Sequence, residues 1–170
     1  MSDEIAENLL APLQVFRFEI TFKRNGSAVP LCSGAFAECS GLEATMEPKV
    51  IKSGGENYGA YQRPGTVSFA TVVLKRGMTT TRDLFKWFQM VNGGSYAYRL
   101  SAEIALKHFV LENKKTPQEK AVEKTAVTWA LDNCLPIKFK AADLNAKGTD
   151  IGIEELHLAH EGLRLVTGGA

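Results

Sequence analysis

The longest regular alternation of apolar and polar residues lies in residues 15–23. Apolar Phe16, Phe18, Ile20 and Phe22 alternate there with Arg17, Glu19, Thr21 and Lys23. A period of two residues is typical of a β-strand with one buried and one wet face. The dipeptide Asn25-Gly26 follows and accepts the positive φ angles of a tight hairpin turn. Residues 29–36 are therefore predicted to return as the partner strand.

One segment has the periodicity of a helix. Its apolar residues, Leu84, Trp87, Phe88 and Val91, recur at intervals of three and four. Threonine hydroxyls at residues 80–81 are predicted to cap its start, and Asn-Gly-Gly at 92–94 ends the pattern. We expect this helix to close one end or face of a β-domain.

Further strands are predicted on both sides of the helix. Residues 66–75 carry apolar side chains at both the odd and the even positions, which is typical of a central strand covered on both faces. The strands predicted after the helix are 96–106, 127–131, 135–140 and 153–166. Gly162 is predicted to mark a bulge in the last of them.

This order of elements lacks a βαβ rhythm and an internal repeat. It favours a mainly β fold, an antiparallel β-barrel or sandwich with one packed α-helix. The predicted core residues are Phe16, Phe18, Ile20, Phe22, Leu84, Trp87, Phe88 and Trp129. At 170 residues the chain is long enough for one core and too short for two ordinary domains, so residues 1–170 are predicted to form a single domain.

Three segments are expected to lie outside the packed core. Residues 1–13 are predicted to be an N-terminal arm. Residues 48–65 are rich in glycine, and a loop of more than about ten residues inside a compact domain is usually functional or mobile. Residues 111–125 form a proline-containing connection of mixed charge, which is expected to be a solvated hairpin tip.

Composition narrows the classes of function. The chain has 20 Lys+Arg against 19 Asp+Glu, so it lacks the basic surplus of a dedicated nucleic-acid binder, although one surface can still concentrate one sign of charge. The N-terminus has no secretory pattern, and no stretch approaches the roughly 20 apolar residues of a membrane span. We expect a soluble protein without stable membrane insertion. Cys32, Cys39 and Cys134 show no CxxC spacing and are expected to be buried free thiols.

Candidate chemistry is sparse. His157 and His160 have HxxH spacing, but on a strand residues three apart point to opposite faces, so no metal site is predicted. The chain contains no GxSxG, HExxH, GxxxxGK[ST] or GxGxxG motif. No catalytic residue and no cofactor are therefore predicted, and the chain is not expected to be an enzyme. Tyr58 and Tyr61 are not part of any alternating or helical pattern of apolar residues. Tyrosine in a flexible loop is a favoured interface anchor.

Several short motifs occur in an order that resembles one family. They are the N-terminal strand, CSGLE at 39–43, GGEN at 54–57, RPG at 63–65, VLKRGMT at 73–79, LFKW at 84–87, then Trp129, Asn133, Pro136 and the closing strand at 153–163. In this order they resemble the phage tail-tube proteins, including the inner-tube proteins of contractile tails and of extracellular contractile injection systems. The resemblance covers nearly the whole chain.

The resemblance implies a structural function. In that family six subunits close a ring by joining their sheets, which consumes exposed strand edges. The rings stack into a hollow tube inside a contractile sheath, and contraction drives the rigid tube through a target envelope. The implied partners are further copies of the chain, the sheath protein, a baseplate hub or spike, a tube terminator, and cargo or DNA in the lumen without sequence-specific binding. The implied location is the bacterial cytoplasm during assembly and then a phage virion or a phage tail-like particle.

Within this framework, residues 48–65 are predicted to reach an adjacent ring. The predicted contact residues are Lys52, Gly54, Gly55, Glu56, Asn57, Tyr58, Tyr61 and Arg63. The 111–125 connection could face the sheath, the lumen or another ring.

Two alternatives stay open. One is a baseplate or adaptor ring of the same machine, present in few copies. The other is a small β-sandwich binding module that recognises a ligand through residues 54–61. The sequence does not distinguish a phage from a bacteriocin or an injection system.

Overall fold

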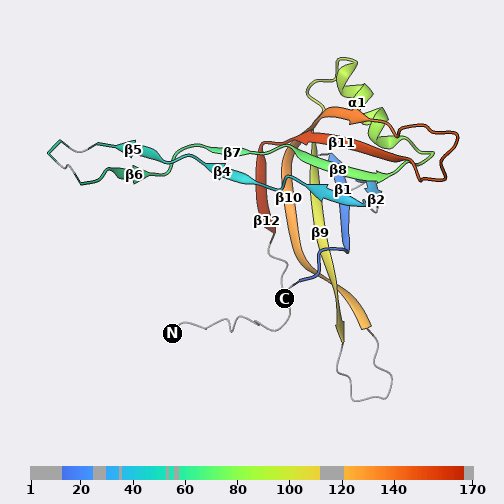
Figure 1. Cartoon of the computed structure of the whole chain (residues 1–170), viewed down its shortest axis with the longest axis horizontal. Coiled ribbons are helices and arrows are strands. Elements are labelled where there is room, and N and C mark those ends of the chain that lie inside the picture. Colours follow the sequence, from blue (N-terminus) through green and yellow to red (C-terminus); the bar gives the residue numbers. More distant parts are fainter. Residues whose placement is uncertain are drawn as a thin grey trace.

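The computed structural model describes residues 13–24, 30–34, 36–52, 54–55, 58–111 and 121–166, with the backbone alone at 30–34, 110–111 and 121–122. It consists of a β-rich body, one helix and a long arm that leaves the body (Figure 1). The predicted turn at Asn25-Gly26, most of the N-terminal arm and residues 112–120 lie outside the described residues.

Two antiparallel sheets form the body. The first contains β2 (Pro30–Gly34), β1 (Phe18–Arg24), β9 (Leu100–Leu111), β10 (Ala121–Lys140) and β12 (Gly162–Val166). The second contains β10 again, β11 (Ile153–Ala159), β8 (Val72–Gly77) and β3 (Glu38–Ser40). The strand order is β2-β1-β9-β10-β11-β8-β3, with β12 also paired to β10. The prediction of a mainly β fold, an antiparallel β-barrel or sandwich with one packed helix, is confirmed, and among the described residues β2 and β3 each pair with one strand.

The strand β10 belongs to both sheets. Residues 121–134 pair with β9, and residues 135–140 pair with β11. The strand bends where Asn133 takes a φ of 52° and the register against β9 shifts. Two separate strands at 127–131 and 135–140 were wrong predictions, because the bend lets one strand of 20 residues continue from sheet to sheet.

The bend in β10 is held by contacts to the β11–β12 junction. Arg164 donates two hydrogen bonds to the Asp132 carboxylate, at 2.8 and 2.6 Å. The Asn133 amide donates to Glu161 at 2.8 Å, and the Glu161 backbone N–H donates to the Asp132 carbonyl at 2.9 Å. A Cβ on Gly162 would lie 2.7 Å from an Asp132 carboxylate oxygen, so a side chain at this position would displace the carboxylate that binds Arg164. The predicted strand 153–166 is therefore two strands that separate next to Gly162.

The hydrophobic core lies between the two sheets. The large side chains that the strands of both layers bury fully are Ile20, Phe22, Val72, Leu74, Leu100, Leu131, Cys134, Leu156 and Leu158. The side chains of β8 are alternately buried and half-buried. The prediction of a strand covered on both faces at 66–75 was wrong, because residues 67–69 belong to the arm and only one face of β8 meets the core.

The helix α1 (Asp83–Asn92) closes one end of the sandwich, as predicted. It buries Leu84, Trp87 and Val91, and the Trp87 ring lies 5.2 Å from the Phe22 ring. The predicted threonine caps are wrong. Arg82 precedes the helix with a φ of 52° and makes no side-chain cap, and Asp83 turns toward β8 instead.

A buried charge cluster fixes the helix to the second sheet. The Arg76 side chain on β8 is 6% exposed, and its Nε donates to Glu154 Oε1 on β11 at 2.5 Å. The same guanidinium binds both carboxylate oxygens of Asp83. Because buried charges need partners, this cluster joins β8, β11 and α1 at one point.

The remaining core predictions are mixed. Phe18 and Trp129 are half-buried and pack against the core, and Phe88 is half-buried with its ring 6.5 Å from that of Phe139. Phe16 is 66% exposed, so its assignment to the core was wrong. The strand begins at Phe18, and the turn before it removes Phe16 from the alternating pattern.

Strand limits near the charged connection also differ from the prediction. The strand predicted at 96–106 begins at Leu100 and continues to Leu111, and β10 begins at Ala121. The strands therefore extend into the 111–125 segment from both ends. No helix within the described residues is long and apolar enough to cross a membrane.

Candidate assembly surfaces

The arm is the most prominent surface of the molecule. It consists of two short antiparallel ladders, β4 (Ala44–Met46) with β7 (Val67–Phe69) and β5 (Lys49–Ile51) with β6 (Tyr61–Arg63). Figure 1 shows it extending far from the body. The predicted loop at 48–65 is thus the outer part of a β-hairpin, and the prediction missed its two strands.

Proline and glycine divide the arm into its two ladders. Pro48 and Pro64 lie between the ladders, one on each strand, and neither has a backbone N–H to donate. At Gly65 the two strands approach so closely that a Cβ would lie 1.9 Å from the Glu47 carbonyl oxygen. A side chain at this position would therefore force the strands apart.

The arm exposes apolar side chains on both strands. Those with large exposed surfaces are Met46, Val50, Ile51, Tyr58, Tyr61 and Val67. Tyr58 is 102% exposed and Tyr61 is 61% exposed. A two-stranded hairpin without a third strand or a covering layer is marginally stable in water. The arm therefore needs a covering surface that its own described residues do not provide.

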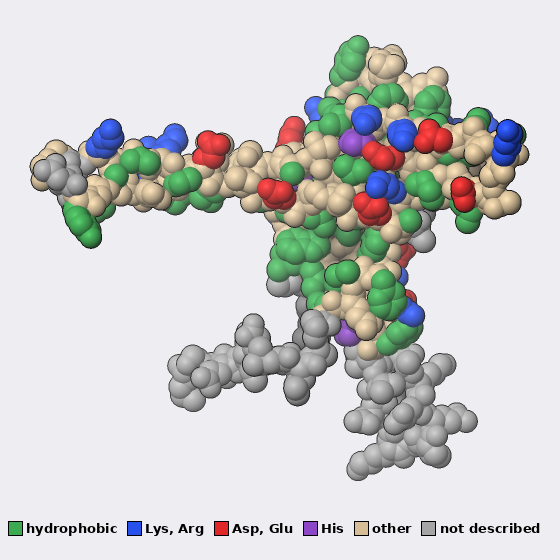
Figure 2. All heavy atoms as spheres, viewed as in Figure 1, with side chains coloured by type: hydrophobic (Ala, Val, Ile, Leu, Met, Phe, Trp, Pro, Cys, Tyr) green, Lys and Arg blue, Asp and Glu red, His purple; other side chains and the backbone are tan. Residues whose placement is uncertain are grey.

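The charges of the arm are separated along its length. Lys49 lies directly opposite Arg63, and the apolar pair Ile51 and Tyr61 lies two pairs further along on the same face. Like charges directly opposite each other destabilise a ladder. Figure 2 shows basic side chains on the outer part of the arm and acidic ones nearer the body. The outer part is thus suited to an acidic, partly apolar partner.

Most of the predicted contact residues lie together on the outer arm. They are Lys52, Gly54, Gly55, Tyr58, Tyr61 and Arg63, while Glu56 and Asn57 fall outside the described residues. The arm also exposes Met46, Val50, Ile51 and Val67, which the sequence analysis did not single out. Three of them lie in the short stretches 50–51 and 67–69 that flank the glycine-rich segment.

A groove opens into the core beside the base of the arm. It has a volume of about 350 Å³ and lies between Phe18, Leu106 and Trp129 of the first sheet and the residues at and around β3 of the second, which are Ala37, Glu38, Cys39 and Leu42. Cys39 lies in this groove, and burial raises the pKa of its thiol to about 11. The groove is therefore an apolar surface continuous with the core.

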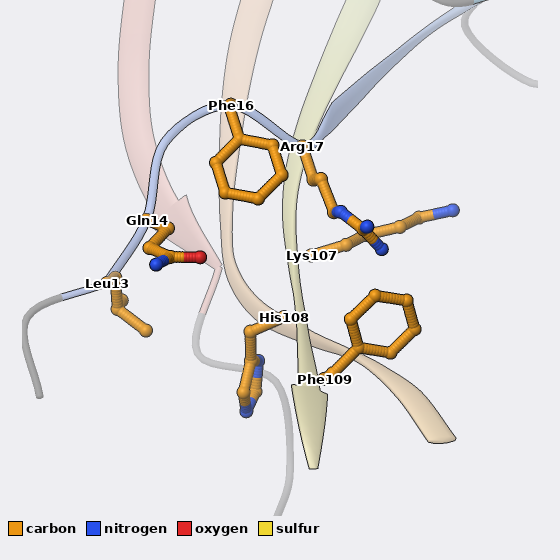
Figure 3. A pocket seen from close by; sticks show the side chains of 7 residues that line it. All are labelled: Leu13, Gln14, Phe16, Arg17, Lys107, His108 and Phe109. Carbon is orange, nitrogen blue, oxygen red and sulfur yellow. The ribbon is translucent and has the colours of Figure 1, made fainter. Parts of the chain in front are cut away.

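A second cleft contains the exposed Phe16. It has a volume of about 280 Å³ and forms where residues 13–17 pass beside β9 (Figure 3). The Arg17 guanidinium lies 4.0 Å from the centre of the Phe109 ring and 5.3 Å from that of Phe16. An arginine between two exposed rings is an arrangement typical of protein interfaces.

The outer face of the first sheet is polar, and its charges are paired. Lys23 binds Glu103 at 2.8 Å, and Lys107 binds Glu19 at 2.6 Å. The hydrogen bond to Glu19 raises the pKa of Lys107. Toward β12, the hydrogen bonds from Arg164 lower the pKa of Asp132. These ion pairs make this part of the face polar, and the cleft at Phe16, Arg17 and Phe109 lies beside them.

The other candidate residues form contacts of their own. His157 binds Glu155, and the hydrogen bond lowers the pKa of that carboxyl. His160 Nδ1 lies 2.9 Å from the Gly162 carbonyl oxygen. Burial raises the pKa of the Cys134 thiol to about 12. Within the described ranges, no group of three His, Cys, Asp or Glu side chains is placed to hold a metal ion.

The chain resembles known proteins in both sequence and fold. The model of the family described as T4-like virus tail tube protein gp19 matches residues 14–164. Among curated proteins no match was found. A chain of the anti-feeding prophage (AFP) baseplate, a structure symmetrised six-fold, is 26% identical over 92% of this chain and 96% of that one, with a TM-score of 0.69.

Two further structures share the fold. A chain of the sheath-tube complex of the extracellular contractile injection system PVC, in its extended state, is 18% identical over 93% of both chains, with a TM-score of 0.69. A chain of the PVC sheath/tube terminator is 19% identical over 94% of this chain and 99% of that one, with a TM-score of 0.68. The family match runs through both sheets, the helix and the arm, and the chain therefore belongs to the tail tube protein family of T4-like viruses.

Proposed function

We propose that the chain is the inner-tube subunit of a contractile tail or tail-like injection particle, in which six copies close a ring and the rings stack into a hollow tube. The observation that carries this proposal is the arm, whose exposed apolar side chains need a covering surface. Membership of the tail tube family supports the class of machine. The 26% identical chain in a six-fold symmetrised baseplate supports the number of copies in a ring.

Unpaired strand edges supply the ring contact. Within the described part of the chain, β2 and β3 pair along one side only, and β12 pairs only with β10. Exposed edges invite pairing with other chains unless a neighbour covers them. Two different edges on one subunit can join in a head-to-tail manner, and such contacts close into a ring when the rotation allows. The sheets of neighbouring subunits then continue into one another.

The arm supplies the contact along the tube axis. A strand rises about 3.3 Å per residue, so the eight residues from Ala44 to Ile51 alone span about 26 Å. For comparison, a compact chain of 170 residues has a radius of gyration of about 15 Å. An arm of this length reaches well past the centre of a neighbouring subunit, and Tyr58 and Tyr61 are its contact residues in the adjacent ring.

The remaining partners follow from this role. The sheath protein surrounds the tube, a baseplate hub or spike and a terminator close its ends, and the lumen conducts cargo or DNA without reading a sequence. The subunit is made in the bacterial cytoplasm and becomes part of the particle. Its role is structural, with no catalysed reaction.

A baseplate or terminator ring of the same machine is the second candidate. The observation that favours it is that the structural neighbours include a chain of a baseplate and one of a terminator complex. Such a ring would share the fold and the edges but would stop growing after one or a few layers.

Electron microscopy of the purified full chain distinguishes these roles. Long hollow tubes in negative stain are the expected result, and rings that never lengthen at any concentration would identify the second candidate instead. Monomers by light scattering at micromolar concentration, without rings or tubes in the microscope, would overturn both.

Variants of the arm test its part in tube growth. Deletion of residues 54–61 should leave a folded subunit that no longer forms tubes. Gly65→Ala should have the same effect, because its Cβ would clash with the Glu47 carbonyl, whereas Gly59→Ala should assemble normally because that site has open space. Long tubes from the deletion variant would refute the axial role of the arm.

A further inference from the structure

We propose that the outer arm of one copy seats in the apolar groove of a second copy, beside Cys39 and Trp129. This inference rests on the proposed function, since it assumes that copies of the chain assemble. It adds the acceptor surface, which neither the family match nor the strand edges specify.

The groove requires an occupant because it exposes part of the core. Phe18, Cys39 and Trp129 pack against the buried cluster from one side and line the groove from the other. The helix α1 closes the opposite end of the sandwich, but no described element covers this end. Filling the groove would bury apolar surface, which stabilises association by about 25 cal/mol per Å² removed from water.

A copy cannot fill the groove with its own outer arm. Leu42 lines the groove, and the arm starts at Ala44 and runs away from the body. The arm tip of another copy has the complementary character: Ile51, Tyr58 and Tyr61 are exposed and apolar. The occupant is thus a second copy of this chain.

Charge supports the same pairing. On the outer arm, Lys49 and Arg63 face each other without an acidic partner between them in the ladder. Glu38 lines the groove and Glu43 follows directly after its residue Leu42. Glu38 already binds Lys75 at 2.9 Å, yet its side chain is 51% exposed and retains room for a second cation. An arm seated here would relieve the like-charge pair at its own ladder.

The pairing explains growth without a fixed end. Donor and acceptor are different surfaces of one molecule, so every seated arm leaves one free arm and one free groove. Such heterologous contacts continue into rings or filaments rather than stopping at a dimer.

Photo-cross-linking from the arm tip tests the assignment. The full-length Cys32→Ser/Tyr58→Cys variant is labelled with benzophenone-maleimide, and the assembled protein is irradiated and analysed by peptide mass spectrometry. The added cysteine takes the label selectively, because burial raises the thiol pKa values of Cys39 and Cys134 to about 11 and 12. Adducts between chains at residues 37–42, Leu106 or Trp129 are the expected result.

The control places the same label elsewhere. Tyr96 is 72% exposed and lies in the body after the helix, so the Cys32→Ser/Tyr96→Cys variant should give no adducts in the groove. Tubes that form normally while the position 58 adducts fall on other surfaces would overturn the inference and leave the proposed function intact. Failure of the wild-type chain to assemble would instead refute the proposed function.

A blocking substitution gives a second readout. Ala37 is exposed at the groove, and Ala37→Arg places a long side chain in it without changing the core. This variant should reduce the yield of sedimenting tubes at least tenfold, while Ala146→Arg, at an exposed loop position, should leave it unchanged. Equal tube yields for the two variants would contradict the seating of the arm.

Discussion

The buried arginine of β8 offers a quantitative test of the packing between the helix and the second sheet. Arg76→Met removes the cation that pairs with Glu154, whose side chain is 4% exposed, and with Asp83. Leaving a buried charge without its partner costs about 3–5 kcal/mol. For a chain of this length each kcal/mol corresponds to about 2–4 °C, so the melting temperature should fall by about 6–20 °C.

The neighbouring residue provides the matched control. Lys75 lies on the same strand but points outward and pairs with the half-exposed Glu38, so Lys75→Met should leave the melting temperature nearly unchanged. Circular dichroism during thermal and urea unfolding measures both variants at one low protein concentration, because assembly would otherwise add to the apparent stability. Equal stabilities of the Arg76→Met and Lys75→Met variants would refute the assignment of the cluster as a structural clamp.

Three further predictions concern the core, the corner of β10 and the thiols. Trp87→Ala should lower the free energy of unfolding, measured in urea, by about 3–5 kcal/mol. Phe16→Ala, at a 66% exposed position, should change it by about 0.5 kcal/mol or less. A larger loss for Phe16→Ala than for Trp87→Ala would show that Phe16 belongs to the core. The hydrogen bonds from Arg164 lower the pKa of Asp132, so its stabilising contribution is complete above the unfolded value of 3.8 and is lost as the pH falls through the lower folded value. The stability difference between wild type and Asp132→Asn should therefore shrink from pH 6 to pH 3, and a difference that grows on acidification would contradict this. In the Cys32→Ser variant, Cys39 should react with Ellman's reagent at pH 8 at least tenfold more slowly than after unfolding in urea, because its thiol pKa is raised to about 11; equal rates would show that the groove does not bury it.

Periodicity alone was sufficient for the elements that pack against the core. The alternation through Phe18, Ile20 and Phe22 predicted β1, and the spacing of Leu84, Trp87 and Val91 predicted α1. In both cases one face is buried against a continuous apolar layer, which is the condition under which periodicity reports structure.

The arm and the long strand escaped prediction for physical reasons. The strands of the arm have no buried face, so their residues carry no alternating pattern, and prolines at 48 and 64 divide them into short pieces. Asn133 joins the runs predicted at 127–131 and 135–140, because it takes a φ of 52° within a continuing strand. Glu161 binds its amide, and Arg164 binds the neighbouring Asp132. These contacts join residues about thirty positions apart and leave no local signal.

The candidate site was predicted in part. The sequence singled out Tyr58 and Tyr61 because they belong to no apolar phase, and both lie exposed on the outer arm. The groove could not be predicted, since Phe18, Cys39 and Trp129 come from three distant segments that only the fold brings together.

The strand shared by the two sheets has a mechanical consequence. Because β10 pairs with β9 over its first part and with β11 over its last, the two layers cannot be pulled apart without stretching a covalent chain that runs through both. A load applied to one layer passes along a peptide backbone into the other, rather than across side-chain contacts that could slide. In the proposed tube, each subunit would therefore carry an axial load as a single rigid body, which is the property that a tube needs if it is to be pushed from one end.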